Sequence, residues 1–245
     1  MCCFSQHVEV SPTRIFARMG MRGRQMLAYQ MQFESLDVVA MVLPLPTPPN
    51  SPEDAVRFIS LEAYPELFDD LNRIFYPPSR SYGGPPPQGF TLAVHVVGDF
   101  IASFVPSLAD LSRLDARFRM PAGTFDKVLE LADWGFAVFQ LHGTKGASKP
   151  HPMAFEFPSR DATRLFFPTL HVHDGALHAE AEFDHALYAQ GVDQLRTFTT
   201  SAHELGPLIA QRSAGILDGG AKISRRAMTG TLPNKDTWFT LLDAR

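Results

Sequence analysis

An Asp-Gly pair at positions 174 and 175 separates two stretches in which apolar and polar residues alternate, within residues 166–185. Such a pair between alternating runs is a strong signal for a tight β-hairpin. With a two-residue turn, His171 lies opposite His178, and His173 shares their face because side chains alternate along a strand. The polar face of this predicted hairpin carries His171, His173, His178, Glu180, Glu182 and Asp184, and the apolar face carries Leu170, Val172, Leu177, Ala179, Ala181 and Phe183.

Three histidines on one face of a sheet indicate a transition-metal site. Neutral imidazole is a good ligand for zinc, copper and iron, and three protein ligands with an open fourth position suit catalysis. The thiolate of Cys2 could be the fourth ligand, and Glu180 could act as a general base from the same face. We therefore predict a metal-binding protein, an oxidase-type or hydrolytic metalloenzyme that holds copper, iron or zinc and acts on a small-molecule or peptide substrate.

Two other functions fit the same residues. If the initiator methionine is removed, Cys2 gains a free α-amino group and can attack an amide carbonyl with that amine as its base, which makes the chain an amidohydrolase. Cys2 before a strand pair, with Arg18 following, resembles the choloylglycine-hydrolase branch of the N-terminal-nucleophile hydrolases, although Met21 stands where that family has an Asp. The third alternative is a non-catalytic binding protein, because any solvated antiparallel hairpin shows the same apolar–polar alternation.

The bulk composition argues against several classes of partner. The 245 residues carry a formal net charge of −4, which gives no electrostatic reason to bind nucleic acid or an anionic membrane. No apolar run reaches the roughly 18 residues that span a bilayer, and the first ten residues turn polar too early for a signal peptide. The two cysteines, Cys2 and Cys3, are neighbours, so we expect no disulfide framework and a buried, hydrophobe-like Cys3. These features predict a cytoplasmic protein.

Periodicity along the chain predicts a single α+β domain over residues 1–245, with a largely antiparallel sheet and helices packed on one side. Five prolines and three glycines within residues 76–89 predict a long surface loop. From residue 218 onward, glycines, basic residues and Pro233 predict an irregular tail. The expected strands are 13–19, 24–34, 38–43, 90–97, 100–105, 134–142 and 153–157, and the expected helices are 65–75, 107–114, 123–133, 192–200 and 205–217.

The order of several short motifs resembles an uncharacterised bacterial family known as a domain of unknown function. An N-terminal Cys segment is followed by a strand pair and by an apolar strand that ends in a Val-x-Pro-x-Pro type motif. The residues that carry this resemblance are Cys2-Cys3-Phe4, 15–18, Met41-Val42-Leu43-Pro44-Leu45-Pro46, Val97-Gly98 and Trp134-Gly135-Phe136. The resemblance implies the same order of elements and assigns no activity.

Overall fold

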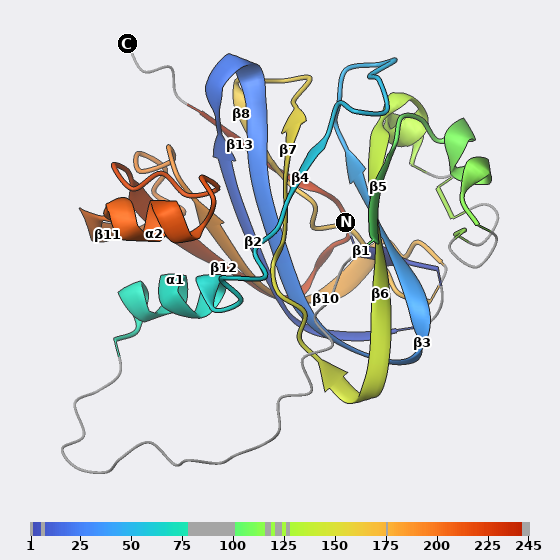
Figure 1. Cartoon of the computed structure of the whole chain (residues 1–245), viewed down its shortest axis with the longest axis horizontal. Coiled ribbons are helices and arrows are strands. Elements are labelled where there is room, and N and C mark those ends of the chain that lie inside the picture. The colour runs from blue at the N-terminus through green and yellow to red at the C-terminus, as the bar shows by residue number, and fades with distance from the viewer. Residues whose placement is uncertain are drawn as a thin grey trace.

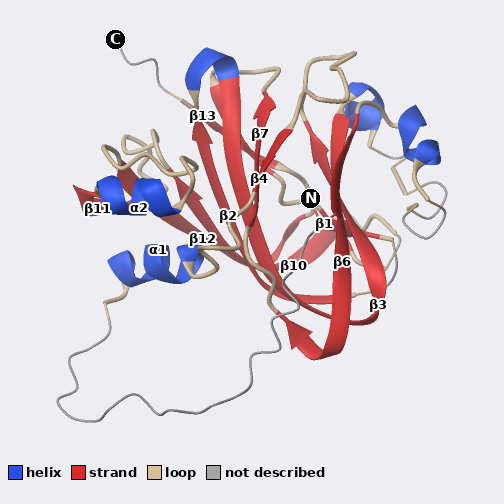
Figure 2. Cartoon of the chain, in the orientation of Figure 1, coloured by secondary structure: helices blue, strands red, loops and turns tan. Residues whose placement is uncertain are grey.

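The structure, a computed structural model, describes residues 2–5, 8–77, 101–115, 119–120, 124–125, 128–174 and 176–241. Its strands form one eleven-stranded sheet and one two-stranded sheet, and two α-helices lie beside one another against the large sheet (Figures 1 and 2). This mainly β architecture agrees in coarse terms with the predicted α+β class. In the described part of the chain, no helix is long and apolar enough to cross a bilayer.

Strands are the most frequent elements of the described chain, and short 3₁₀ turns lie between some of them. The strands are β1 Cys2–Phe4, β2 Glu9–Met19, β3 Arg24–Leu45, β4 Arg57–Ile59, β5 Ile101–Val105, β6 Gly135–Ser148, β7 Met153–Pro158, β8 Arg164–Phe167, β9 His171–Val172, β10 Glu180–Ala189, β11 Thr199–Glu204, β12 Lys222–Pro233 and β13 Thr237–Thr240. The helices are α1 Leu67–Phe75 and α2 Pro207–Arg212, and the 3₁₀ turns are η1 Met21–Gly23, η2 Ala109–Arg113 and η4 Leu129–Asp133.

The 22-residue strand β3 connects most of the large sheet. Its first half pairs with β2 along one edge and with β7 along the other. Its second half pairs with β6, and at Met41 and Val42 it also pairs with β1. The apolar run that includes these two residues is buried, as expected for a strand with neighbours on both sides. The predicted strands 24–34 and 38–43 are therefore parts of one continuous strand.

Two of the strand pairings in the described residues are parallel, so the sheet is mixed. Strand β10 runs parallel to β2 from His185, opposite Thr13, to Ala189, opposite Ala17. Strand β9 runs parallel to β1. The remaining pairings are antiparallel, which agrees with the expectation of a largely antiparallel sheet.

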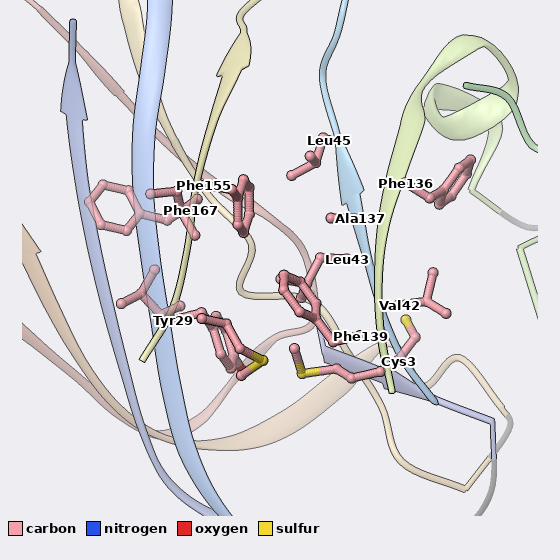
Figure 3. Close-up of a cluster of buried hydrophobic side chains, with 14 of the residues drawn as sticks. Cys3, Tyr29, Val42, Leu43, Leu45, Phe136, Ala137, Phe139, Phe155 and Phe167 are labelled. Carbon is pink, nitrogen blue, oxygen red and sulfur yellow. The ribbon is translucent and has the colours of Figure 1, made fainter. Parts of the chain in front are cut away.

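An aromatic core fills the space between the curved strands (Figure 3). Phe155 of β7 belongs to this core and is fully buried. Its ring centroid is 5.9 Å from that of Phe139, 6.1 Å from that of Phe58 and 6.1 Å from that of Phe157. Cys3 is also buried in this core, as predicted. The high phenylalanine content of the chain thus builds the interior, where aromatic rings contribute large buried areas.

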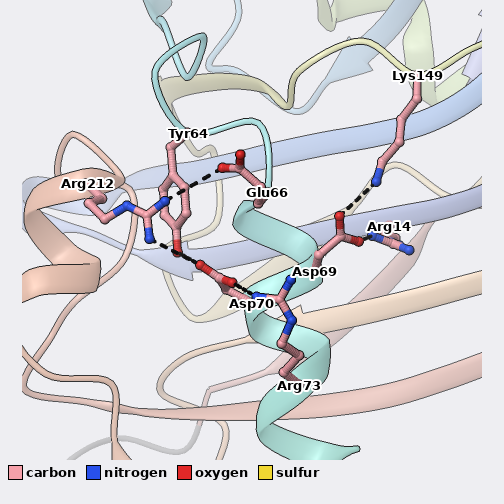
Figure 4. Close-up of polar contacts among 8 residues, drawn as sticks. All are labelled: Arg14, Tyr64, Glu66, Asp69, Asp70, Arg73, Lys149 and Arg212. Atoms are coloured by element: carbon pink, nitrogen blue, oxygen red, sulfur yellow. Dashed lines mark hydrogen bonds and ion pairs between the residues drawn. The ribbon is translucent and has the colours of Figure 1, made fainter. Parts of the chain in front are cut away.

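Helix α1 covers the outer face of the sheet and is fastened there by ion pairs (Figure 4). Asp69 accepts hydrogen bonds from Arg14 of β2 and from Lys149, the latter at 2.9 Å. Burial alone would raise the pKa of the Asp69 carboxyl, but these two cations lower it below its usual value. The next residue, Asp70, pairs with Arg212 of α2 at 3.3 Å. Both helices are therefore joined to each other and to the sheet.

Several sequence predictions for the second half of the chain are wrong. Residues 192–200 form turns and the start of β11 in place of a helix, because Thr199 and Thr200 pair with β12. The expected irregular tail from residue 218 contains the strands β12 and β13, and β12 pairs with the whole of β10.

The helices expected in the middle and second half of the chain are shorter than predicted. The helix expected over 205–217 is limited to α2, and the helix expected over 107–114 is the 3₁₀ turn η2. Of the helix expected over 123–133, the described part contains η4. The predicted loop 76–89, beyond its first two residues, and the predicted strand 90–97 lie outside the described residues.

The buried side chain of Gln25 ties β3 to the small sheet. Its Nε2 donates to the carbonyl oxygen of Phe166 at 2.7 Å, and the Phe166 N–H donates to Oε1 at 3.0 Å. We expect Gln25→Met to lower the free energy of unfolding by about 2 kcal/mol, because two buried backbone groups lose their partner. Urea denaturation measures this. The control Gln211→Met, on the exposed side of α2, should change stability by less than about 0.5 kcal/mol, and equal losses in the two variants would contradict the role of Gln25.

Candidate functional site

The predicted two-residue hairpin at Asp174-Gly175 does not form. Strand β9 pairs with β1, and β10 pairs with β12 and β2, so residues 171 and 178 are not cross-strand partners. Gly175 itself lies outside the described residues. The Asp174 carboxylate instead organises the connection, because it accepts a hydrogen bond from the Ala176 N–H at 3.0 Å and contacts His178 Nε2 at 2.8 Å. An Asp side chain that bonds two residues ahead is a common local turn device.

Asn234, just after β12, holds β9 in place. Its Oδ1 accepts a hydrogen bond from the His171 N–H at 2.7 Å, and its Nδ2 donates to the His171 carbonyl at 2.8 Å and to the His178 carbonyl at 3.1 Å. One nearly buried amide thus satisfies three backbone groups of the β9–β10 connection. This residue is a structural part of the site that sequence reasoning missed.

The structure brings together a different set of histidines from the predicted one. The rings of His171 and His173 stack with centroids 4.9 Å apart, and the His171 ring lies 4.7 Å from the ring of His185. The Nε2 atoms of His171 and His185 are 2.9 Å apart, a hydrogen-bond distance. Phe183 packs on His171 with centroids 4.5 Å apart. We call His171, His173 and His185 the histidine cluster.

Burial controls the protonation of this cluster. It lowers the pKa of His171 to about 2, with further lowering by the neighbouring His185 and His173. Burial also lowers the pKa of His185, although the adjacent carboxylate of Asp184 opposes the shift. His171 and His185 are therefore neutral at ordinary pH, and one ring donates an N–H to the lone pair of the other.

His178 and Glu180 lie apart from the cluster. The side chain of His178 is 62% exposed and contacts Asp174, with its ring nitrogen directed at that carboxylate. Glu180 is exposed at the start of β10. Cys2 lies in β1 with its backbone beside His171, and its side chain lies outside what the structure describes. The expected convergence of His171, His173 and His178 on one point is therefore wrong.

The metal-binding prediction fails for the same geometric reason. Among the described residues, no group of three or more His, Cys, Asp or Glu side chains is arranged to hold a metal ion. The Nε2 atoms of His171 and His185 face each other, so the N–H of one ring and the lone pair of the other form a hydrogen bond between the two histidines. The predicted grouping of His171, His173 and His178 is thus corrected to a packed cluster of His171, His173 and His185.

The sequence pattern around His185 indicates that this residue is buried. It continues the alternating apolar positions of β10, between Phe183 and Leu187, and it is 3% exposed. A histidine at a core position of a strand needs a hydrogen-bonding partner inside the protein. That requirement pointed to another buried polar side chain nearby, which is His171.

A groove of about 560 Å³ opens beside the histidine cluster. Carboxylates predominate among its charged groups, and no Lys or Arg is among its described lining residues, so it does not suit an anionic ligand. The polar lining residues are Thr13, His171, His173, Asp174, His178, Glu180, Glu182, Asp184 and Asn234.

Comparisons with known proteins give a match in structure alone. No protein-family model matches the chain, and no curated protein matches it in sequence. The crystal structure of baculovirus P35 superposes with a TM-score of 0.57 at 14% identity, over 99% of this chain and 100% of that one. The chain has the P35 fold. A mutated P35 after caspase cleavage gives a TM-score of 0.49 at 13% identity over 96% of this chain and 98% of that one, and the P35 chain of a caspase-8/P35 complex gives 0.48 at 10% over 95% and 97%.

The site itself corrects the predicted metalloenzyme function, because no group among the described residues is arranged to hold a metal ion and the histidines pack against one another. The likeness to P35 shows the fold. P35 has been crystallised in complex with caspase-8, and a mutated P35 has been crystallised after caspase cleavage. The recorded partner of P35 is a protein, whereas the sequence of this chain predicts a small-molecule or peptide substrate. The resemblance to the bacterial family of unknown function stays a prediction.

Proposed function

We propose that this chain is a non-catalytic protein that binds a protease of the caspase class. The observation that supports this most is the extent of the likeness to P35, which includes both chains from end to end. A shared fold alone can host unrelated functions. P35 itself, however, forms a complex with caspase-8. A cytoplasmic location, as expected from the sequence, is part of this proposal.

Caspases cleave after aspartate, which gives the proposal a chemical signature. If the chain is bound in the manner of a substrate, cleavage creates a new amino terminus directly after one of its Asp residues. Exposed chain segments outside strands and helices are where such cleavage concentrates. Asp54 and Asp193 are exposed in turns of the described structure and are possible positions. Intact-mass analysis identifies the position without assuming it.

Inhibition of purified caspase-8 tests the proposal. For a dissociation constant of about 10 nM, about 1 µM of the chain would leave roughly 1% of the caspase free, so hydrolysis of a fluorogenic peptide should fall about a hundredfold. A single cut after Asp should be seen by mass spectrometry. Replacing the mapped Asp by Ala should abolish both effects, while Asp→Ala at an uncut, equally exposed position should leave them intact.

Two results would contradict the proposed caspase binding. Unchanged turnover across a panel of caspases at micromolar concentrations of the folded chain, with no complex on size-exclusion chromatography, would overturn the proposal. Chymotrypsin-like proteases serve as the control class, and equal inhibition of both classes would also contradict a caspase-specific function.

A further inference from the structure

The histidine cluster links β9 and β10, two strands that follow each other along the chain. His171 belongs to β9, His173 follows it directly, and His185 belongs to β10. The edge of the His173 ring also meets Phe4 of β1, with centroids 5.9 Å apart. We propose that these three histidines form a pH-sensitive latch, which holds β9 and β1 against β10 at neutral pH and opens as the pH falls below about 6.

The protonation states of His171 and His185 determine whether their rings can form a hydrogen bond. A ring nitrogen either donates an N–H or accepts through its lone pair, so the 2.9 Å contact between the two Nε2 atoms needs one proton between them. When both rings are imidazolium, both Nε2 atoms carry hydrogens that face each other. The contact is then lost, and two like charges lie side by side.

The surroundings of the cluster make protonation costly. His185 is almost fully buried, and the aromatic rings of Phe183 and Phe4 pack against the other two imidazoles. A buried charge without adequate hydrogen bonding is strongly unfavourable. The lowered pKa values of His171 and His185 agree with this geometry. Protons are therefore taken up after the strands separate.

The charged groups near the cluster do not remove this cost. The Asp184 carboxylate is 3.6 Å from His185 Nδ1 and favours a proton there, but its side chain is half-exposed. The amino terminus of the chain opposes protonation of both His171 and His185. Three further acids near the cluster are exposed to solvent: Glu180 lines the groove beside it, and Glu9 and Glu34 line a second groove with His173. Asp174 contacts His178, Glu182 accepts from Thr231 of β12, and the strand positions opposite His185 are Thr13 and Met228.

Besides the latch, β9 is attached by one short strand pairing, by Asn234 and by the buried side chain of Val172. Strand β9 has two residues, and within the described structure its strand partner is β1, itself three residues long. Asn234 supplies the other backbone contacts of β9. Opening of the latch should therefore free β9 and loosen β1, while β2, β3, β6 and β7 stay paired through their long ladders.

The sign and size of the effect follow from proton linkage. The folded latch binds fewer protons than the open one, so its stability is complete above the unperturbed histidine pKa of about 6.5 and is lost as the pH falls through that value. Each histidine with a lowered pKa multiplies the opening equilibrium by about tenfold per pH unit below 6.5. For His171 alone, opening should rise about eightfold between pH 7.0 and pH 5.5, and the lowered pKa of His185 increases this factor further.

Hydrogen exchange with mass spectrometry at pH 7.0 and 5.5, corrected for intrinsic exchange rates, tests the latch. Between the two pH values, the protection of the amides of residues 171–174 should fall by at least about eightfold relative to the protection of the β7 amides. His178→Gln, which removes an exposed histidine from the same connection, should leave this difference unchanged. The double variant His171→Phe/His185→Phe should abolish it. Equal exchange of 171–174 at both pH values in the unmodified chain would overturn the proposal.

Nuclear magnetic resonance of the unmodified chain gives a second readout that does not depend on the double variant folding. The ring nitrogens of His171 and His185 should keep fixed neutral tautomers from pH 7.5 to 6.0. Independent titration of His171 or His185 near pH 6.5, with protection of 171–174 retained, would also overturn the proposal.

Discussion

Replacing Phe155 by Ala is expected to lower the free energy of unfolding by about 3–5 kcal/mol. The ring is fully buried and contacts the rings of Phe58 of β4, Phe139 of β6 and Phe157 of β7 itself. Figure 3 shows Phe155 and Phe139 among the buried side chains. Its removal leaves a cavity that these neighbours cannot fill, because each is fixed to its own strand. Guanidinium denaturation, followed by circular dichroism, measures the loss.

Leu208→Ala is the matched control for this prediction. Leu208 is 68% exposed on α2, so removing its side chain should change stability by less than about 0.5 kcal/mol. A loss below about 1 kcal/mol for Phe155→Ala would mean that β7 does not face the interior as the structure has it.

Replacing Asn234 by Ala should lower the free energy of unfolding by about 3 kcal/mol, because three backbone groups lose their hydrogen-bond partner. The side chain is 9% exposed and contacts both the N–H and the carbonyl of His171 as well as the His178 carbonyl. Denaturant unfolding gives the overall loss, and hydrogen exchange should show it first in residues 171–174. This variant tests the anchoring of β9 separately from the titration of the histidines.

Asn72→Ala is the appropriate comparison, because Asn72 accepts one long hydrogen bond, at 3.3 Å, from the Tyr188 hydroxyl. Its removal should cost less than about 1 kcal/mol. If Asn72→Ala and Asn234→Ala were equally destabilising, the three contacts of Asn234 would not be the anchor of β9.

Features that depend on neighbouring residues were predictable from the sequence. The strand pair 13–19 and 24–34, its tight connection and helix α1 all follow from local alternation or helical periodicity, and the structure contains them. Local patterns succeed here because the partner of each residue lies within about 25 residues along the chain.

Features that depend on distant partners were not predictable in this way. Asp174-Gly175 between alternating runs favours a hairpin, but β9 is paired by β1, about 170 residues earlier in the chain. Tertiary pairing thus outweighed the local turn signal. Strand β12 was missed because its exposed and buried residues do not alternate regularly and it includes Gly230. The candidate site changed accordingly, since His185 enters it through β10 and His178 leaves it toward Asp174.

The position of β3 has a consequence for synthesis of the chain on the ribosome. When β3 emerges, β1 and β2 are already available, but β6 and β7 begin about 90 and 108 residues after the end of β3. One long edge of β3 therefore waits for its partners during several seconds of translation at about 5–20 residues per second. An uncovered strand edge in a nascent chain readily pairs with other chains. We expect newly made chains to need chaperone protection until residue 158 has emerged, and truncation before β6 to yield aggregates.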